Sequence, residues 1–338
     1  MRPSFAVALL FFAAAITAKA VDIALPTDND ALYRDDGPAF YQYVDRDYQG
    51  AKSTPWEGGR YGFVRDPLQT SGGVVFTRFH EGIDIKPVHR DENNEPLDEV
   101  RAIGDGKVVH ANPVAGFSNY GRYVVVEHVW GGSPYYSLYG HLNHISVKVG
   151  ETVKKGATLG IMGYTGEGIN RERAHVHLEL NLILNPDFQK WYDYYFPRDP
   201  NHNGAYNGLN LSGLNIAKFF LALQKNPSLT VPEFLAGEEV FYKVAIPKSH
   251  HFNLAKLYPW MVHDSGNGHS WEVSFTRSGL PLRIEASDKK VKQPELSYVK
   301  KGSVDYNHLT RGDLMGRGDN GSLSPTGFRN VRLLIYPD

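Results

Sequence analysis

The sequence predicts a mainly β protein whose first large domain is a small antiparallel sheet. Short apolar runs are separated by turn residues such as Asp105-Gly106, Gly131-Gly132 and Gly150. No helical pattern lies between these runs, so the crossover helices that a parallel sheet requires are not expected. The chain also contains 20 tyrosines, 34 glycines and 20 prolines, a composition typical of strands joined by turns.

The first twenty residues have the features of a secretory signal peptide. Arg2 gives a positive start, residues 5–16 are almost wholly apolar, and Ala18 and Ala20 are the small residues that precede a cleavage site. The apolar run is shorter than the roughly 20 residues that span a bilayer. We therefore expect cleavage after Ala20, export to the periplasm or the extracellular cell envelope, and no transmembrane segment in the mature protein.

Composition limits the chemistry further. The chain has no cysteine, so neither disulfides nor thiolate metal ligands are possible, and any metal must be bound by His, Asp or Glu. The formal net charge is −1. A nearly neutral chain argues against nucleic acid as a partner, because that partner requires a basic surface.

The elements of the first domain follow in order. Residues 21–73 are rich in Asp, Tyr, Pro and Gly, and we interpret them as an irregular segment that wraps the domain. Residues 74–196 form the domain itself. Its main predicted strands are residues 108–109, 123–126, 135–139, 145–149, 158–162 and 175–183.

A second domain is predicted at residues 211–338, after a connection rich in Pro and Asn. Apolar residues at helical spacing between 214 and 221 predict one helix, and Thr230 with Glu233 resembles the capping box of a second that ends at Gly237. The remaining runs predict strands at residues 240–246, 271–275, 282–284 and 331–336. This region is expected to be a mainly β accessory domain with one or two helices and an unknown role.

Three short segments of the first domain carry residues suited to metal chemistry. They contain His80 with Asp84, then His141, then His175 with His177. Residues two apart in a strand point to the same face, so His175, His177 and Glu179 share a face opposite an apolar one. Two imidazoles and one carboxylate form a standard catalytic zinc set that leaves a fourth position for water. Taken alone, the histidine pair is better explained as a solvated or hydrogen-bonded structural pair.

Together, the order and spacing of these segments resemble the lysostaphin-type (LytM-like) zinc peptidases. The resemblance covers residues 74–183 and includes the segments 100–109, 139–142, 147–156 and 163–166. It implies one zinc ion per chain with His80, Asp84 and His177 as ligands, and His141 and His175 as catalytic histidines. We favour His175 as the general base and His141 as the oxyanion stabiliser, because His175 neighbours a ligand on the same strand face. Many relatives have Gly-Pro before the His-x-His motif, where this sequence has residues 169–174 instead.

The resemblance implies a secreted zinc metalloendopeptidase that hydrolyses peptide bonds in peptidoglycan stem peptides or cross-links. One alternative is a non-catalytic relative that binds the cell wall or activates another hydrolase. Such relatives typically lack a ligand or a catalytic histidine, whereas all five positions are filled here. Another alternative gives the main function to the accessory domain, as a binder of glycan or of a protein partner.

Several further residues are expected to be structural. His89, His110, His128 and His144 match no motif position. The tripeptides Arg311-Gly-Asp313 and Arg317-Gly-Asp319 are interpreted as turn chemistry in a loop rich in Gly and Asp. The aromatic segment 191–196 is expected to pack in a core or between the two domains.

Overall fold

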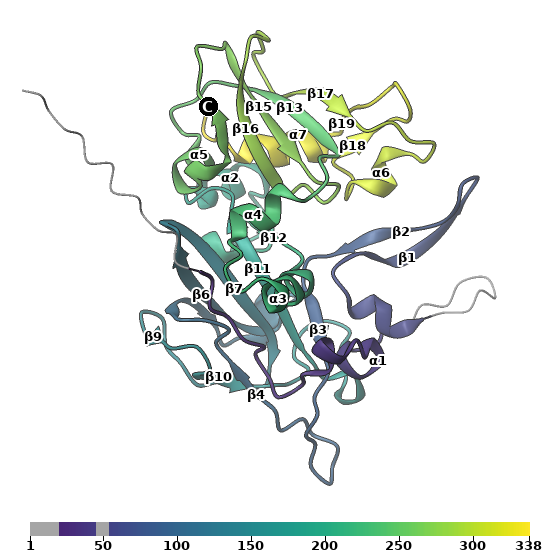
Figure 1. The fold of residues 1–338 in the computed structure, drawn as a ribbon, viewed down its shortest axis with the longest axis vertical. Helices are drawn as coiled ribbons and strands as arrows, with labels where there is room; N and C mark the ends of the chain where they lie inside the picture. The colour runs from purple at the N-terminus through teal and green to yellow at the C-terminus, as the bar shows by residue number, and fades with distance from the viewer. Residues whose placement is uncertain (1–19, 45–53) are drawn as a thin grey trace, which may run out of the picture.

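The computed structural model describes residues 20–44 and 54–338 (Figure 1). Residues 1–19, which hold nearly all of the predicted signal peptide, lie outside the described residues. Across the part of the chain that is described, no helix has the length and apolar character needed to cross a membrane. The chain forms two stacked parts, with the first β domain below the C-terminal region in Figure 1.

The centre of the first part is a seven-stranded antiparallel sheet, which confirms the predicted fold class. Its strand order is β12-β11-β7-β6-β5-β9, and β3 pairs with β11. These strands are β3 (Ile83–Ile85), β5 (Gly106–Asn112), β6 (Arg122–Trp130), β7 (Ser133–Leu142), β9 (Thr152–Val153), β11 (Val176–Ile183) and β12 (Leu211–Gly213). A three-stranded sheet of β4 (Glu99–Arg101), β10 (Thr158–Ile161) and β8 (His144–Ile145) accompanies it. The strand predicted at 145–149 is shorter than expected because a turn follows, in which Glu151 N donates to Lys148 O.

Strand β11 shows how the sheet positions polar groups. Every residue from Val176 to Ile183 is buried. Val176, Leu178, Leu180 and Leu182 belong to the main hydrophobic core. The alternate residues point to the opposite face, where polar side chains are enclosed by other elements rather than by water.

The segment before the sheet is more regular than predicted. It contains η1 (Ala31–Arg34), α1 (Gly37–Phe40), η2 (Pro55–Gly59) and then a hairpin of β1 (Gly62–Thr70) with β2 (Gly73–His80). The expectation of irregular structure up to residue 73 was therefore wrong for β1. A bulge between Phe63 and Arg65, followed by Asp66 with φ 53° and Pro67, interrupts the alternation by which a strand is recognised.

The C-terminal region contains a five-stranded sheet with order β14-β16-β15-β13-β17, in which β14 and β16 are parallel. The strands are β13 (Tyr242–Pro247), β14 (Val262–Asp264), β15 (Ser270–Phe275), β16 (Pro281–Ser287) and β17 (Glu295–Val299). A small pair, β18 (Leu314–Met315) with β19 (Ser322–Leu323), follows. The predicted helices are present as α3 (Ile216–Lys225) and α4 (Val231–Ala236), and the capping box of Thr230 and Glu233 is formed.

More helices are present in this region than the one or two predicted. The others are α5 (Asn253–Leu257), α6 (Tyr306–Leu309) and α7 (Pro325–Leu333), and a 3-10 turn η6 (Pro259–Met261) follows α5. The strand predicted at 331–336 was wrong, because α7 covers its beginning. Ser324 caps this helix by accepting a hydrogen bond from Gly327 N, and Pro325 occupies its first turn.

The connection between the two parts is closely packed. Helix α2 (Phe188–Tyr195) places Trp191 in a buried cluster with Phe188 and Leu333, and Trp191 Nε1 donates to Arg329 O at 3.1 Å. A short turn η5 (Gly204–Tyr206) leads into β12, which pairs with β11. Because β12 is a strand of the first sheet, a domain boundary at 211 is misplaced, while the division into two domains stays a prediction.

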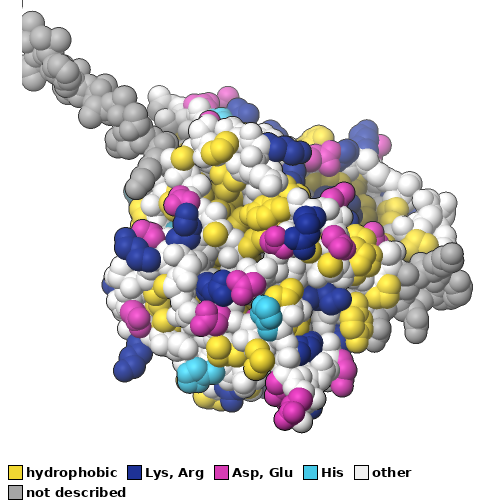
Figure 2. Space-filling view, turned by 60° about the horizontal axis from the view of Figure 1, so that its bottom comes forward, with side chains coloured by type: hydrophobic (Ala, Val, Ile, Leu, Met, Phe, Trp, Pro, Cys, Tyr) yellow, Lys and Arg dark blue, Asp and Glu magenta, His cyan; other side chains and the backbone are white. Residues whose placement is uncertain are grey.

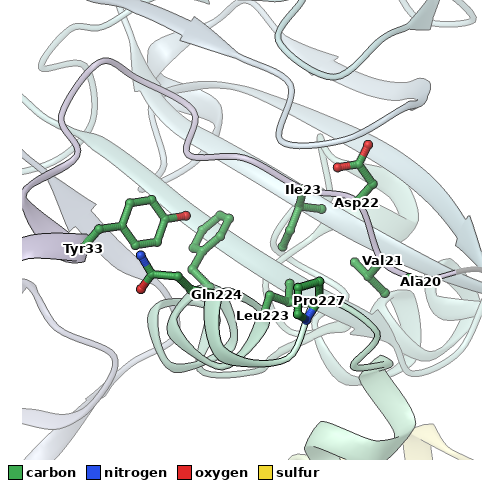
Figure 3. Close-up of a pocket in the computed structure, with 9 residues that line it drawn as sticks. Ala20, Val21, Asp22, Ile23, Tyr33, Leu223, Gln224 and Pro227 are labelled. Carbon is green, nitrogen blue, oxygen red and sulfur yellow. The ribbon is translucent and has the colours of Figure 1, made fainter.

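The surface carries charges of both signs, and one surface cavity lies between the N-terminal residues and α3. Basic and acidic side chains are interspersed over the face drawn in Figure 2, in keeping with the formal net charge of −1. A cavity of about 370 Å³ is formed between residues 20–23, Tyr33 and one side of α3 (Figure 3). Its lining includes none of the five predicted site residues.

Candidate metal centre

The fold brings all five predicted site residues together. His80 ends β2, Asp84 is the middle residue of β3, His141 is near the end of β7, and His177 lies in β11. His175 directly precedes β11. In the antiparallel register His177 is opposite Asp84 on one side and Gly140 on the other. The five side chains are buried, with exposures between 2% and 7%.

Three donor atoms converge on one point. His80 Nε2 lies 3.1 Å from His177 Nδ1 and 3.1 Å from Asp84 Oδ1, and His177 Nδ1 lies 3.0 Å from the same Asp84 oxygen. Tetrahedral zinc with ligand bonds of about 2.0–2.1 Å separates its ligand atoms by roughly 3.4 Å. In residues 20–44 and 54–338, this is the one group of three or more acidic or His side chains with the spacing of a metal site. The donor set and the spacing therefore fit zinc.

Both candidate histidine ligands are oriented by a partner at the other ring nitrogen. With the tautomers assigned from these contacts, His80 Nδ1 donates to Arg60 O at 2.8 Å and His177 Nε2 donates to Glu179 Oε1 at 2.8 Å. Such partners fix the tautomer and the ring direction of a metal ligand. Burial lowers the pKa of His177, but the hydrogen bonds to Asp84 and Glu179 outweigh it and raise the pKa to about 9. A metal at Nδ1 must therefore displace a proton.

Glu179 was noticed in the sequence for its shared strand face, but it was given no role. Its carboxylate accepts hydrogen bonds from His177, from Asn181 Nδ2 at 2.8 Å and from the hydroxyl of Tyr120 at 2.8 Å. Burial raises the pKa of Glu179, but the bond to His177 and the other donors lower it on balance, so the group stays ionised. The position two residues after His177 was the available signal.

Arg65 is a second residue that the sequence did not reveal. Its Nη2 lies 2.6 Å from Asp84 Oδ2, and its Nε donates to Gly58 O at 2.9 Å. Asp84 Oδ2 is thus held by the guanidinium, while Oδ1 faces the two imidazoles. Burial opposes ionisation of Asp84, but His80, His175 and Arg65 hold the pKa of its carboxyl well below the usual range. Arg65 lies in the strand that was predicted to be irregular and before the segment that carries the family resemblance.

His141 and His175 form a second pair beside the three donors. Their ring centres are 4.7 Å apart, and the Nδ1 atoms donate to Thr165 O at 2.8 Å and Arg173 O at 2.7 Å, respectively. The Nε2 atoms remain for chemistry, and that of His175 lies 3.3 Å from Asp84 Oδ1. Burial and the neighbouring His175 and His177 hold the pKa of His141 well below its usual value.

The backbone at His141 is unusual. Its φ is 62°, in the left-handed region that residues other than Gly and Asn rarely adopt. His141 N donates to Tyr120 O at 2.7 Å, which holds this conformation. Residues in such conformations concentrate at functional sites, where the surrounding structure enforces them.

The segment that departs from the family pattern is well formed. Residues Arg171–Arg173 make a short 3-10 turn η4, which Asn170 caps by accepting from Arg173 N. Arg171 Nε pairs with Glu95 Oε1 at 2.8 Å, and the side chain of Gln42 donates to Glu172 O at 3.1 Å. This wall beside His175 is thus tied to two distant parts of the chain.

Comparison with known proteins agrees with the family resemblance inferred from the motifs. Residues 78–186 match the model of the family described as Peptidase family M23. A glycyl-glycine endopeptidase, ALE-1, of Staphylococcus capitis is 36% identical over 106 residues, which are 31% of this chain and 25% of that protein. Peptidoglycan DD-endopeptidase ShyB of Vibrio cholerae is 39% identical over 88 residues, or 25% of this chain and 18% of the relative.

An uncharacterised metalloprotease of Haemophilus influenzae is 32% identical over 141 residues, which cover 37% of this chain and 26% of that protein. The chain thus spans between 18% and 26% of the length of these relatives. The matched family model covers the region that holds the five residues, and the comparisons confirm the resemblance inferred from the sequence motifs.

Proposed function

Because residues 78–186 form a peptidase family M23 domain, we propose that this chain is an exported zinc metalloendopeptidase that cuts peptidoglycan stem peptides or cross-links. The observation that carries the proposal is the convergence of His80, Asp84 and His177, beside two further histidines whose Nδ1 atoms donate to backbone carbonyls. The substrate class is supported by relatives that are themselves peptidoglycan or glycyl-glycine endopeptidases.

In this proposal His80 Nε2, Asp84 Oδ1 and His177 Nδ1 hold one zinc ion per chain. When bound in a site with three protein ligands, zinc acidifies water and polarises a carbonyl group. Arg65 and Glu179 keep the ligand atoms in place, because each hydrogen-bonds the far side of a ligand.

His141 and His175 divide the proton transfer and the stabilisation of the oxyanion between them. Each has its Nδ1 hydrogen directed to a backbone carbonyl, so in the neutral form Nε2 accepts a proton and in the charged form it donates one. We assign His175 as the general base, because its Nε2 lies beside the ligand Asp84. His141 then has the second role, and the pH profile of each variant tests the division.

Purified mature protein provides the direct test. Metal analysis should give one zinc per chain, and mass spectrometry of digests of defined peptidoglycan fragments should show hydrolysis of one type of peptide bond. Removal of the metal by a chelator should abolish cleavage, and added zinc should restore it. Zinc binding without any cleavage of these fragments would favour the non-catalytic relative, and full cleavage by metal-free protein would contradict the proposal.

A further inference from the structure

Arg311, in the C-terminal region, contacts the two chain neighbours of a candidate metal ligand. Arg311 Nη2 lies 2.6 Å from Glu81 Oε1, and the Arg311 guanidinium lies 5.4 Å from the centre of the Phe79 ring. Phe79 and Glu81 are the two neighbours of His80 in the chain. Arg311 thus contacts the residues before and after His80, a candidate ligand, although it lies 231 residues further along the chain.

Other residues after 210 enclose the same segment. The hydroxyl of Tyr61 donates to Gly213 O at 2.8 Å, and Tyr61 packs edge-on against Phe79 with ring centres 5.1 Å apart. Gly213 approaches Glu81 so closely that an added Cβ would lie 2.4 Å from Glu81 O. Arg277 lies 4.8 Å from the centre of the Phe63 ring, and Phe63 in turn packs against Phe79. In Figure 1, the β1–β2 hairpin lies beside α6 at the lower edge of the C-terminal region.

The loop that presents Arg311 is held firmly from within the C-terminal region. Arg311 has φ 56°, and Gly312 after it has φ 81°. Thr310, which is fully buried, donates to Tyr306 O at 2.7 Å and accepts from Leu314 N at 3.0 Å. Asp313 accepts from Asn330 Nδ2 at 2.9 Å. These bonds hold the backbone on both sides of Arg311 without help from Glu81.

The second Arg-Gly-Asp tripeptide, at residues 317–319, allows a direct comparison with the first, at residues 311–313. The side chain of Arg317 is 63% exposed and lies 3.8 Å from Asp305, whereas that of Arg311 is 34% exposed. Asp319 pairs with the exposed Lys301. Both tripeptides looked like turn chemistry in the sequence, but the arginine of the first contacts both chain neighbours of His80.

We propose that Arg311 is a positioning residue for the metal centre, which places His80 by holding Glu81 and Phe79 and so makes the C-terminal region part of the site. The proposal rests on the proposed function, because it concerns the same three ligands. An arginine is suited to this role, since its planar group can pair with a carboxylate and lie over an aromatic ring at once.

The test measures the zinc affinity of the full mature chain by competition with a chelator of known affinity, using zinc alone as the probe. Arg311→Gln should weaken zinc binding by about tenfold, at the lower end of the loss usual for residues that orient a ligand. Arg317→Gln is the matched control and should stay within about twofold of wild type, because an exposed ion pair contributes little. In a Glu81→Gln background, the effect of Arg311→Gln should largely disappear, since the two residues act through one contact.

Each outcome is informative. Equal zinc affinity of Arg311→Gln, Arg317→Gln and wild type would overturn the inference while leaving the proposed function intact. Wild-type protein that binds no zinc would overturn both. If Arg311→Gln is unfolded by circular dichroism, Glu81→Gln decides, because it removes the partner of the same contact: a folded variant with weaker zinc binding supports the role, and one with wild-type affinity refutes it.

Discussion

The region that matches family M23 (residues 78–186) and the C-terminal region (residues after 210) bury different kinds of polar residue. The first buries His80, Asp84, His141, His175, His177 and Glu179 in one place. The core of the second consists of apolar residues such as Val244, Val273 and Ile284, and most of its buried polar residues are Ser or Thr. Burial of ionisable groups costs free energy unless they are paired. A cluster of buried ionisable groups is therefore a candidate functional site.

The contrast has one exception, which clarifies it. Asp313 is a buried carboxyl in the C-terminal region, and burial raises its pKa, although the nearby Arg311 opposes this. It lies in the loop that holds Arg311 against Glu81. The buried charge of the second region thus occurs where that region meets the site of the first.

The largest expected effect is the loss of a ligand. Asp84→Ala should lose most bound zinc and with it all measurable cleavage, because two imidazoles remain of three ligands. Metal analysis of the purified variant measures this. Asp305→Ala, which removes an exposed carboxylate of the C-terminal region that pairs with Arg317, is the comparison and should retain zinc. Full zinc occupancy in Asp84→Ala would mean that the ligand set is wrong.

The next effect separates catalysis from binding within the same cluster. His141→Ala and His175→Ala should keep zinc but lose cleavage by roughly 100-fold or more, the usual scale for an acid–base group or an oxyanion donor. The acidic limb of the kcat/KM profile should disappear in the variant that lacks the base. Wild-type rates in both variants would reduce the pair to a structural role.

His128 sharpens the comparison, because it is buried in the same region but matches no motif position. Its ring nitrogens contact Asp105 O and Ser137 Oγ at 2.8 and 2.7 Å. Burial lowers its pKa to about 4 despite the bond to Asp105. The unfolded chain, with an ordinary His pKa near 6.5, therefore binds more protons between these values.

Stability should consequently fall as the pH drops from about 6.5 to about 4, by about 3 kcal/mol from this group. Urea unfolding of wild type and His128→Gln in the presence of a chelator isolates the contribution as the difference between their pH profiles. Zinc affinity should be nearly the same in both proteins. Identical slopes of stability against pH would show that His128 does not carry this penalty.

A smaller effect is expected at Arg65. Arg65→Gln should weaken zinc binding by about tenfold, because Asp84 Oδ2 loses its partner, and Arg65→Lys should restore part of the affinity. Arg78 is directly across the hairpin from Arg65 and is exposed, so Arg78→Gln changes the same charge without touching Asp84. Equal losses in the two Gln variants would point to net charge rather than to the contact.

The sequence predicted what depends on local pattern. Alternation placed His175, His177 and Glu179 on one face, and turn residues marked the antiparallel strands. The capping box at Thr230 was visible because its two partners are three residues apart. Strand β1 was missed because a bulge and Asp66-Pro67 break the period, and α7 because its apolar end resembled a strand.

The remaining parts of the site depend on contacts between distant segments. Arg65 reaches Asp84 across 19 residues, and the two arginines of the C-terminal region lie about 200 or more residues from the rings that they cover. Nothing in the local pattern around Arg311 distinguishes it from Arg317. Such partners become visible once the strands are placed, since pairing of distant segments is decided by the whole fold.

One measurement tests the central claim most directly. Anomalous diffraction at the zinc absorption edge, from crystals of the zinc-loaded protein, locates the metal without reference to activity. The account predicts one strong peak within about 2.0–2.2 Å of His80 Nε2, His177 Nδ1 and Asp84 Oδ1. A peak bound by other residues, or none at this position in fully loaded protein, would contradict it.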